Sequence, residues 1–167
     1  TPPCVVALID ARVTRVVVGH LDPNPLVSGK GVALLRDAGI EVETENMPEA
    51  LKLIESFQTR MVKKRPFVRI KTASSLDGAI SMASGESKWI TGEEARSDVQ
   101  YWRARSDAII SGVGSVLHDN PRLTLREADY DGVTQPIRVI LDSRFRTPRG
   151  ANVLTDGAPT LVVSDCG

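Results

Sequence analysis

Residues 108–118 have the sequence AIISGVGSVLH, which joins a short apolar run to a glycine-rich turn and a brief helical stretch. The run at 108–110 is typical of a buried strand, the turn occupies 112–115, and 116–118 continues as a helix. Two more runs typical of buried strands follow at 137–141 and 160–163. Because strands that alternate with helices usually pair in parallel, the sequence predicts an α/β fold built on mostly parallel sheets.

The stretch upstream of this turn predicts a strand and a capped helix. Residues 67–72 are expected to form a strand, which the sequence SSLDG at 74–78 ends. Thr91 and Glu94 have capping-box spacing, in which the Thr91 side chain accepts a hydrogen bond from the Glu94 N–H. We therefore expect a helix from this cap to about Arg105.

The first third of the chain predicts a similar alternation of elements. The DPNP sequence at 22–25 is expected to be a rigid loop, because its prolines fix φ and so direct the Asp22 and Asn24 side chains. The basic sequence KKRP at 63–66 marks an expected domain boundary, although it can also be an ordinary connection. Helices are expected around 5–9, 31–37 and 47–61, and strands at 14–18 and 40–42.

The composition, with 41% hydrophobic residues, is that of one ordinary globular core or two small ones. Lys plus Arg total 21 and Asp plus Glu total 21, so no net charge attracts nucleic acid or an anionic membrane. No apolar run approaches the roughly 18 residues of a spanning helix, so a cytoplasmic location is expected.

Cys4 and Cys166 lie at opposite ends and are expected to be reduced. The chain begins without Met and stops just after a strand pattern, which indicates a fragment of a longer protein.

Glycine and arginine residues offer candidate phosphate ligands. The 112–115 turn could bring backbone N–H groups against a phosphate, but it lacks the third glycine of a dinucleotide fingerprint and is equally typical of a tight bend. Arg103, Arg105 and Arg126 could make bidentate phosphate contacts, with a solvated surface as the alternative. The residues alone thus indicate a phosphate-binding α/β protein without naming a cofactor.

Four further residues could have a chemical role or a purely structural one, and the local sequence does not decide between the two. Lys71 lies in the expected strand 67–72 and could stabilise negative charge or transfer a proton, or equally extend to solvent at a sheet edge. Cys4 opens a helix, whose N-terminus favours a thiolate and metal ligation, but one cysteine is not a zinc site. His20 and His118 are expected to be surface or packing residues.

The order of the motifs is more specific than any one of them. The motifs in series are TPPC at 1–4, DPNP at 22–25, SLDG at 75–78, ASGESKWIT at 83–91 and DNPRLT at 119–124. Together they resemble the bifunctional deaminase/reductase family of riboflavin biosynthesis, over the whole chain. Residues 1–62 are similar to the C-terminal part of its cytidine-deaminase-like domain, and 66–167 to the first part of its dihydrofolate-reductase-like reductase domain.

In the deaminase half, the resemblance implies a zinc-bound water that hydrolyses the pyrimidine amine. Cys4 matches the second of the family's two cysteine ligands, and Asp22 and Asn24 match a loop near the deaminase substrate. The family's His-Ala-Glu motif and its other cysteine are not in this sequence. We therefore do not expect this chain alone to deaminate a substrate.

In the reductase half, the resemblance implies that NADPH reduces the ribosyl group of 5-amino-6-(5-phosphoribosylamino)uracil to a ribitylamino product. Lys71 matches a lysine near the reacting carbon, and Trp89 is expected to be a wall of the nicotinamide pocket. By the family pattern, the cofactor-contacting positions are Ala73, Trp89, Ser115, Asp119 and Ser143. The substrate-contacting positions are Ser87, Arg103, Leu123 and Arg126.

Two alternatives to the reductase function remain open at this point. The zinc deaminase activity could be the dominant one, or the chain could be a non-catalytic dihydrofolate-reductase-like module that oligomerises. The resemblance also implies a homodimer or tetramer formed through the reductase domain, a small-molecule substrate, and no nucleic-acid or membrane partner. The family's reductase continues past residue 167, so the cofactor site in this chain is expected to be incomplete.

Overall fold

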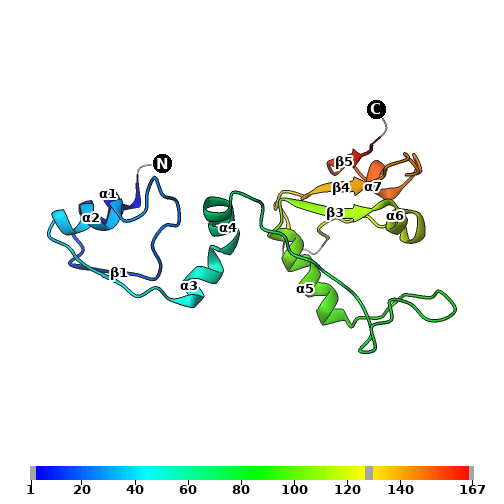
Figure 1. Ribbon diagram of the computed structural model, residues 1–167, viewed down its shortest axis with the longest axis horizontal. Helices are drawn as coiled ribbons and strands as arrows, with labels where there is room; N and C mark the ends of the chain where they lie inside the picture. The colour runs from blue at the N-terminus through cyan, green and yellow to red at the C-terminus, as the bar shows by residue number, and fades with distance from the viewer. Residues whose placement is uncertain (1–2, 127–129, 166–167) are drawn as a thin grey trace. The chain divides into compact units, whose positions relative to one another are not determined.

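The computed structural model describes residues 3–126 and 130–165, and it divides into two compact units, Thr1–Lys71 and Thr72–Gly167 (Figure 1). The basic segment 63–66, where the sequence predicts a domain boundary, lies shortly before this division. Cys166 lies outside the described residues. None of the helices in the described ranges has the length and apolar character needed to cross a bilayer.

The first unit contains a two-stranded parallel sheet with its neighbouring helices. Strand β1 pairs with β2 so that Arg15 lies opposite Glu41. Leu35, Ile40 and Val42 form the buried cluster, because α1 and α2 place apolar side chains on one face of this sheet. The elements are α1 (Cys4–Asp10), β1 (Arg15–Val18), α2 (Lys30–Asp37), β2 (Glu41–Thr44), α3 (Pro48–Leu53) and α4 (Glu55–Lys63).

The single helix predicted over 47–61 is wrong in one respect, because the structure contains two helices there. Ile54 separates α3 from α4 and leaves helical geometry, with φ −111° and ψ 17°. Its N–H donates to Leu51 O, a shortened i to i−3 bond. The apolar repeat continues across the break, so the spacing alone could not reveal it.

The strand predicted at 67–72 is also wrong, because the structure assigns no strand there. Val68 is 65% exposed and Ile70 is 83% exposed, so their apolar side chains are not packed. A strand needs a hydrogen-bonded partner, and no ladder within the described part of the chain includes these residues. The local sequence has strand composition but cannot supply that partner.

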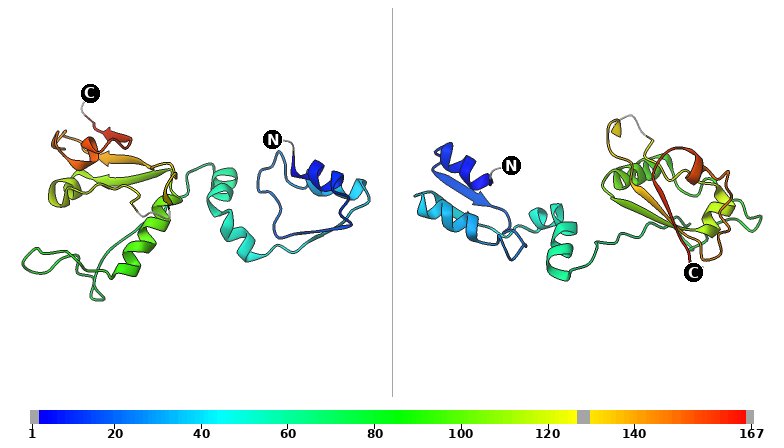
Figure 2. Two further views of the ribbon diagram at one scale, coloured as in Figure 1. Left: turned by 180° about the vertical axis from the view of Figure 1, so that it is seen from behind. Right: turned by 90° about the horizontal axis from the view of Figure 1, so that it is seen from above.

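The second unit is built on a three-stranded parallel sheet in the order β3-β4-β5 (Figures 1 and 2). This confirms the predicted α/β class with parallel pairing. Strand β4 is central, and each crossover passes through a short helix, as parallel neighbours require. The elements are α5 (Glu93–Ala104), β3 (Ala108–Gly112), α6 (Val113–Asp119), β4 (Ile137–Leu141), α7 (Asn152–Thr155) and β5 (Thr160–Val163).

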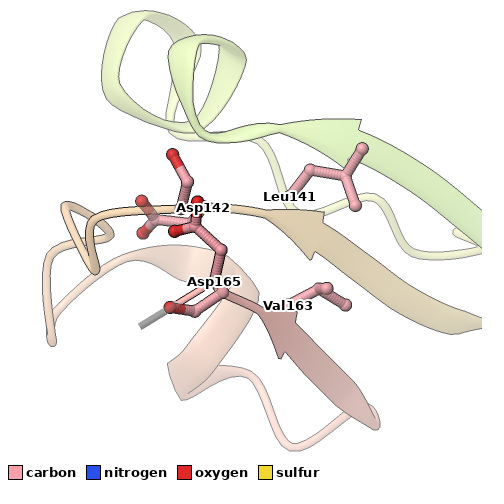
Figure 3. A pocket seen from close by; sticks show the side chains of 6 residues that line it. Leu141, Asp142, Val163 and Asp165 are labelled. Atoms are coloured by element: carbon pink, nitrogen blue, oxygen red, sulfur yellow. The ribbon is translucent and has the colours of Figure 1, made fainter. Parts of the chain in front are cut away.

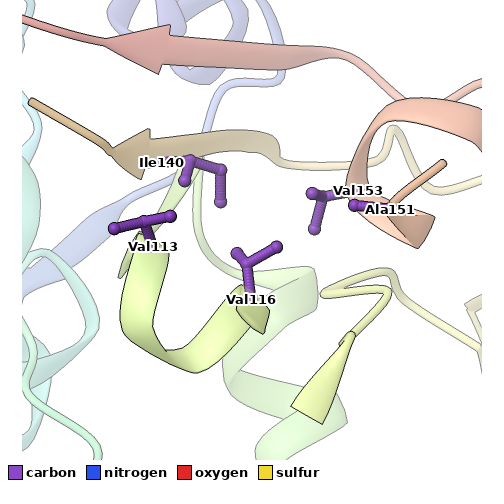
Figure 4. Packing of buried hydrophobic residues seen from close by; sticks show 5 residues of the cluster. All are labelled: Val113, Val116, Ile140, Ala151 and Val153. Atoms are coloured by element: carbon purple, nitrogen blue, oxygen red, sulfur yellow. The ribbon is translucent and has the colours of Figure 1, made fainter. Parts of the chain in front are cut away.

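One face of this sheet carries the core of the second unit. Ile140 of β4 is fully buried, and α6 and α7 cover it with small apolar side chains (Figure 4). The cluster consists of Val113, Val116, Ile140, Ala151 and Val153. The opposite face is exposed at Ile110, Leu141, Leu161 and Val163. The expectation of fully buried strands therefore holds for one face only.

Two local predictions about helix starts are corrected by the structure. The capping box is not formed: Gly92 is the N-cap residue of α5 in an extended conformation, and no side-chain cap hydrogen bond is present. Thr91 contributes its carbonyl instead, which accepts a hydrogen bond from Arg96 Nη1 at 2.6 Å. The 112–115 segment is not a separate turn, because α6 begins at Val113 directly after the strand. Gly112 is the N-cap residue of α6 and has an extended conformation, with φ −87° and ψ 154°.

Candidate functional site

The candidate site lies at the carboxyl ends of β4 and β5, where parallel strands of α/β proteins commonly bind ligands. An open cavity of about 280 Å³ is found there (Figure 3). Its lining consists of Leu141, Asp142, Ser143, Val163, Ser164 and Asp165. At the same edge, β3 leads directly into α6, and a Cβ built at Gly112 or Gly114 would meet no atom within 4 Å. A ligand could therefore approach this backbone closely.

Asp142 fixes the loop that follows β4 and thereby positions Ser143. Its side chain is buried, and its oxygens accept hydrogen bonds from Arg146 N at 3.0 Å and from the N–H and hydroxyl of Thr147 at 2.7 Å each. Burial raises the pKa of this carboxyl, but the hydrogen bonds from the loop outweigh it and lower the pKa below 3.8. Asp142 is therefore a structural carboxylate whose charge the loop requires.

This lowered pKa makes a prediction about acid stability. The stabilisation by the Asp142 carboxylate is present above 3.8, its ordinary pKa, and is lost as pH falls through the lower folded-state pKa. We expect Asp142→Asn to lower the free energy of unfolding at neutral pH and to flatten its decline in acid. Urea denaturation from about pH 7 to about pH 2 measures this slope. Asp165→Asn, at an exposed carboxylate of the same cavity, is the control; a wild-type slope in Asp142→Asn would refute the assignment.

The loop at 120–126 carries two of the predicted substrate residues, Leu123 and Arg126. It leaves α6 through Asn120, which has φ 41°, and Leu123 also has a positive φ of 56°. Arg103, at the end of α5, donates from Nη1 to Thr124 O at 2.8 Å. The structure thus brings Arg103 together with this loop, although they are distant in sequence.

Arg103 and Arg126 form a positively charged pair. Burial lowers the pKa of Arg103, and the charge of Arg126 lowers it further. Two guanidinium groups that repel each other gain from an anion placed between them, since each then has a charge-assisted partner. Arg105 is arranged differently, because its guanidinium lies 5.5 Å from the centre of the Tyr101 ring. Of the three candidate arginines, Arg103 and Arg126 are therefore the pair suited to a phosphate.

Three predicted residues lie in the segment that precedes α5. Ala73 and Ser87 are half-buried, and Trp89 is 73% exposed, so Trp89 is not a core aromatic. The Arg96 guanidinium lies 4.5 Å from the centre of the Trp89 ring, while Arg96 also binds Thr91 O. One face of the indole is thus held against α5. This segment extends below the sheet in Figure 1.

Two further predicted residues, Ser115 and Asp119, are exposed on α6. Asp119 Oδ1 lies 3.1 Å from His118 Nδ1, and His118 is exposed, as expected. Ser143 lines the cavity. Lys71 is exposed at the end of the first unit. The predicted cofactor residues therefore fall into two groups, one near the strand ends and one before α5.

The predicted deaminase residues lie in the first unit. Asp22 Oδ1 accepts a hydrogen bond from Asn24 N at 2.8 Å, and Asn24 Oδ1 accepts one from Leu26 N at 3.1 Å, so this loop is held by its own side chains. Cys4 is an exposed, free thiol at the start of α1. The described residues contain no group of three metal-ligating side chains. Since a zinc ion needs about four ligands, the described part does not by itself supply a zinc site.

Three residues that support the site were not predicted from the sequence: Gln135, Arg138 and Asp142. Arg138 and Asp142 carried a signal, because a charged side chain within or just after an apolar strand is unusual and is normally paired when buried. Arg138 is 0% exposed and its Nη1 lies 2.7 Å from Asp156 Oδ1. The short helix α7 was also missed, since a single turn gives no periodicity.

A family model and curated proteins that are similar to this chain share one name. The family model described as the RibD C-terminal domain matches residues 66–166. The chain is 46% identical over 169 residues to the riboflavin biosynthesis protein RibD of Bacillus amyloliquefaciens, covering 100% of this chain and 45% of that protein. It is 46% identical over 157 residues to RibD of Escherichia coli, covering 87% of this chain and 43% of that protein. The chain thus spans about half the length of the curated relatives that it matches.

Solved structures show the same similarity. RibD of Acinetobacter baumannii aligns with a TM-score of 0.85 at 51% identity, covering 98% of this chain and 47% of that chain. A protein of Thermotoga maritima aligns with a TM-score of 0.85 at 42% identity, covering 98% of this chain and 46% of that chain. Its printed description is a diaminohydroxyphosphoribosylaminopyrimidine deaminase and 5-amino-6-(5-phosphoribosylamino)uracil reductase.

Proposed function

The chain belongs to the RibD C-terminal domain family, and from this we propose that it forms part of an NADPH-dependent reductase of riboflavin biosynthesis. Its substrate is 5-amino-6-(5-phosphoribosylamino)uracil, and its product carries a ribitylamino group. Residues 66–167 are the first portion of this reductase domain, and 1–62 are the C-terminal portion of a zinc deaminase domain. The proposal rests on Arg103 and Arg126, because Arg103 binds Thr124 O at 2.8 Å on the loop that carries Arg126, so both positive side chains can serve a sugar phosphate.

The arginine pair binds the phosphate and orients the ribose. A sugar phosphate carries close to two negative charges, so two guanidinium groups can neutralise it with charge-assisted hydrogen bonds. Ser87 and Leu123 contact the remainder of the substrate. Anchoring the non-reacting phosphate holds the ribosyl carbon in a defined place, which lowers the entropic cost of the reaction.

The cofactor residues bind NADPH at the strand ends and before α5. NADPH, when bound, supplies the hydride that reduces the ribosyl carbon. Trp89 forms a wall of the nicotinamide pocket, since Arg96 already holds one face of the indole. The other contacts are made by Ala73, Ser115, Asp119 and Ser143. The open space beside Gly112 and Gly114 supports this placement, because a cofactor can approach the backbone there.

Lys71 stabilises negative charge on the reacting oxygen or supplies a proton to it. In a full-length protein that carries this chain, we expect Lys71→Met to lower kcat about tenfold with little change in KM, as for a group that acts mainly in the transition state. Steady-state kinetics with NADPH measure both constants. A variant with wild-type kcat would remove Lys71 from the mechanism, and Lys64→Met, at an exposed lysine after α4, is the control.

NADPH oxidation in the presence of the deaminated phosphoribosylaminopyrimidine tests the proposal. The full-length protein is expected to oxidise NADPH only when this substrate is added. Absence of oxidation, together with zinc-dependent release of ammonia from the preceding diaminopyrimidine, would favour a protein that is mainly a deaminase. Absence of NADPH binding would favour a non-catalytic module. We also propose that the full-length protein acts in the cytoplasm and forms a homodimer or tetramer through the reductase domain. Light scattering measures this oligomeric state.

A further inference from the structure

The loop at 120–126 is held by side chains from other elements at every second backbone carbonyl from 120 to 124. Asn152, at the start of α7, donates from Nδ2 to Asn120 O at 2.7 Å, and its N–H donates to Asn120 Oδ1 at 2.8 Å. Arg138 Nη1 donates to Arg122 O at 2.8 Å. Arg103 Nη1 donates to Thr124 O at 2.8 Å. These contacts fix a segment that has no regular secondary structure of its own.

Gln135 completes this set with a two-bond clamp on Leu125. Leu125 N donates to Gln135 Oε1 at 2.8 Å, and Gln135 Nε2 donates to Leu125 O at 3.0 Å. The amide side chain thus takes both hydrogen bonds that a neighbouring strand would make with this residue. Leu125 is 7% exposed and its neighbour Arg126 is exposed. The clamp therefore anchors the backbone immediately before the arginine.

The positive φ of Leu123 shows why such anchoring is needed. A leucine at φ 56° occupies a region that branched or bulky side chains rarely adopt, and the conformation costs on the order of 1 kcal/mol. It persists only where the surroundings determine the backbone on both sides. Arg138 binds the carbonyl before Leu123, and Arg103 and Gln135 bind the two residues after it.

We propose that Gln135 and Arg138 are positioning residues for substrate binding, because they hold the 120–126 loop in the conformation that presents Leu123 and Arg126. The inference rests on the proposed reductase function, in which Leu123 and Arg126 contact the phosphoribosyl substrate. Neither Gln135 nor Arg138 touches the substrate itself. Arg138 is fully buried, and its guanidinium joins the loop, at Arg122 O, to Asp156 and Ala158 beyond α7. A preorganised loop binds its ligand without the entropic cost of ordering.

Gln135→Met tests this inference, because methionine keeps the size of the side chain and removes both hydrogen bonds. In the full-length protein, we expect KM for the phosphoribosylaminopyrimidine to rise about tenfold, while kcat and KM for NADPH stay within about twofold. Thr160→Val is the matched control, since it removes one side-chain hydrogen bond, to Val153 O, from the same unit but away from the loop. Equal KM values in the two variants, after thermal denaturation shows similar stability, would overturn the inference.

A binding measurement with ribose 5-phosphate tests this inference separately from the proposed function. Isothermal titration calorimetry of the full-length protein is expected to give about tenfold weaker binding of ribose 5-phosphate in Gln135→Met than in the wild type. If the wild type oxidises no NADPH, the reductase proposal fails. The binding measurement still decides whether the hydrogen bonds between Gln135 and Leu125 set the affinity for a sugar phosphate. Unchanged affinity, or no measurable affinity in the wild type, would overturn the positioning role.

Discussion

Replacing Arg126 with Met in the full-length protein is expected to raise KM for the phosphoribosylaminopyrimidine about a hundredfold and to leave KM for NADPH unchanged. One charge-assisted contact with a phosphate contributes up to about 3 kcal/mol, and each 1.4 kcal/mol changes an equilibrium constant about tenfold. Arg126 and Arg103 repel each other without an anion, so the gain on phosphate binding is shared by both groups. Steady-state kinetics with each substrate varied in turn measure the two constants.

Arg105→Met is the matched control for this prediction. Arg105 follows α5 close to Arg103 in sequence, but its guanidinium lies over the Tyr101 ring. We expect this variant to change KM for either substrate by less than about twofold, because exposed arginines contribute little on average. If Arg105→Met and Arg126→Met raised KM equally, or if Arg126→Met raised KM for NADPH instead, the assignment of the phosphate site to the Arg103 and Arg126 pair would be wrong.

Replacing Arg138 with Met is expected to lower the free energy of unfolding of the second unit by about 3 to 5 kcal/mol. Removing one partner of a buried ion pair leaves the other charge uncompensated, and this is far more costly than breaking an exposed pair. Arg138 is 0% exposed and its guanidinium binds Asp156 Oδ1, Arg122 O and Ala158 O. Among the described residues its Nε has no hydrogen-bond partner, so one buried donor of this guanidinium is unsatisfied there.

Hydrogen exchange of the β4 amides during urea denaturation measures this loss within the second unit. Arg144→Met is the control, since Arg144 is exposed on the loop after β4, and a surface substitution of this kind changes stability by about 0.5 kcal/mol or less. The double variant Arg138→Met with Asp156→Asn is expected to recover part of the loss, because it also removes the unpaired carboxylate. A loss below about 1 kcal/mol in Arg138→Met would show that the pair is not structurally important.

The strands of the second unit could be predicted from the sequence because their information is local. The runs at 108–110, 137–141 and 160–163 are short, apolar and rich in branched side chains, and all of them form strands. The run at 67–72 has similar composition but no ladder within the described residues. Strand formation there depends on a partner that the local pattern does not specify, so composition was sufficient in one case and misleading in the other.

The candidate site could be predicted only in part. The ordered series of motifs identified Arg103 and Arg126, and in the structure Arg103 binds the loop that carries Arg126, at Thr124 O. Two residues that help to hold the loop, Gln135 and Arg138, were missed, because they bind backbone atoms 10 and 16 residues away in sequence. A glutamine before a strand has no feature that distinguishes it from a surface residue. Such support becomes visible only when the folded backbone brings its carbonyls within reach.

The transfer of deuterium from the cofactor to the product is a direct test of the proposed NADPH-dependent reduction. The full-length protein is incubated with 5-amino-6-(5-phosphoribosylamino)uracil and with NADPH deuterated on the transferring face of the nicotinamide, and the product is analysed by mass spectrometry. We expect a ribitylamino product with one deuterium on the carbon that was the ribosyl C1′. Product without deuterium from either face of the cofactor, or no reduced product at all, would contradict it.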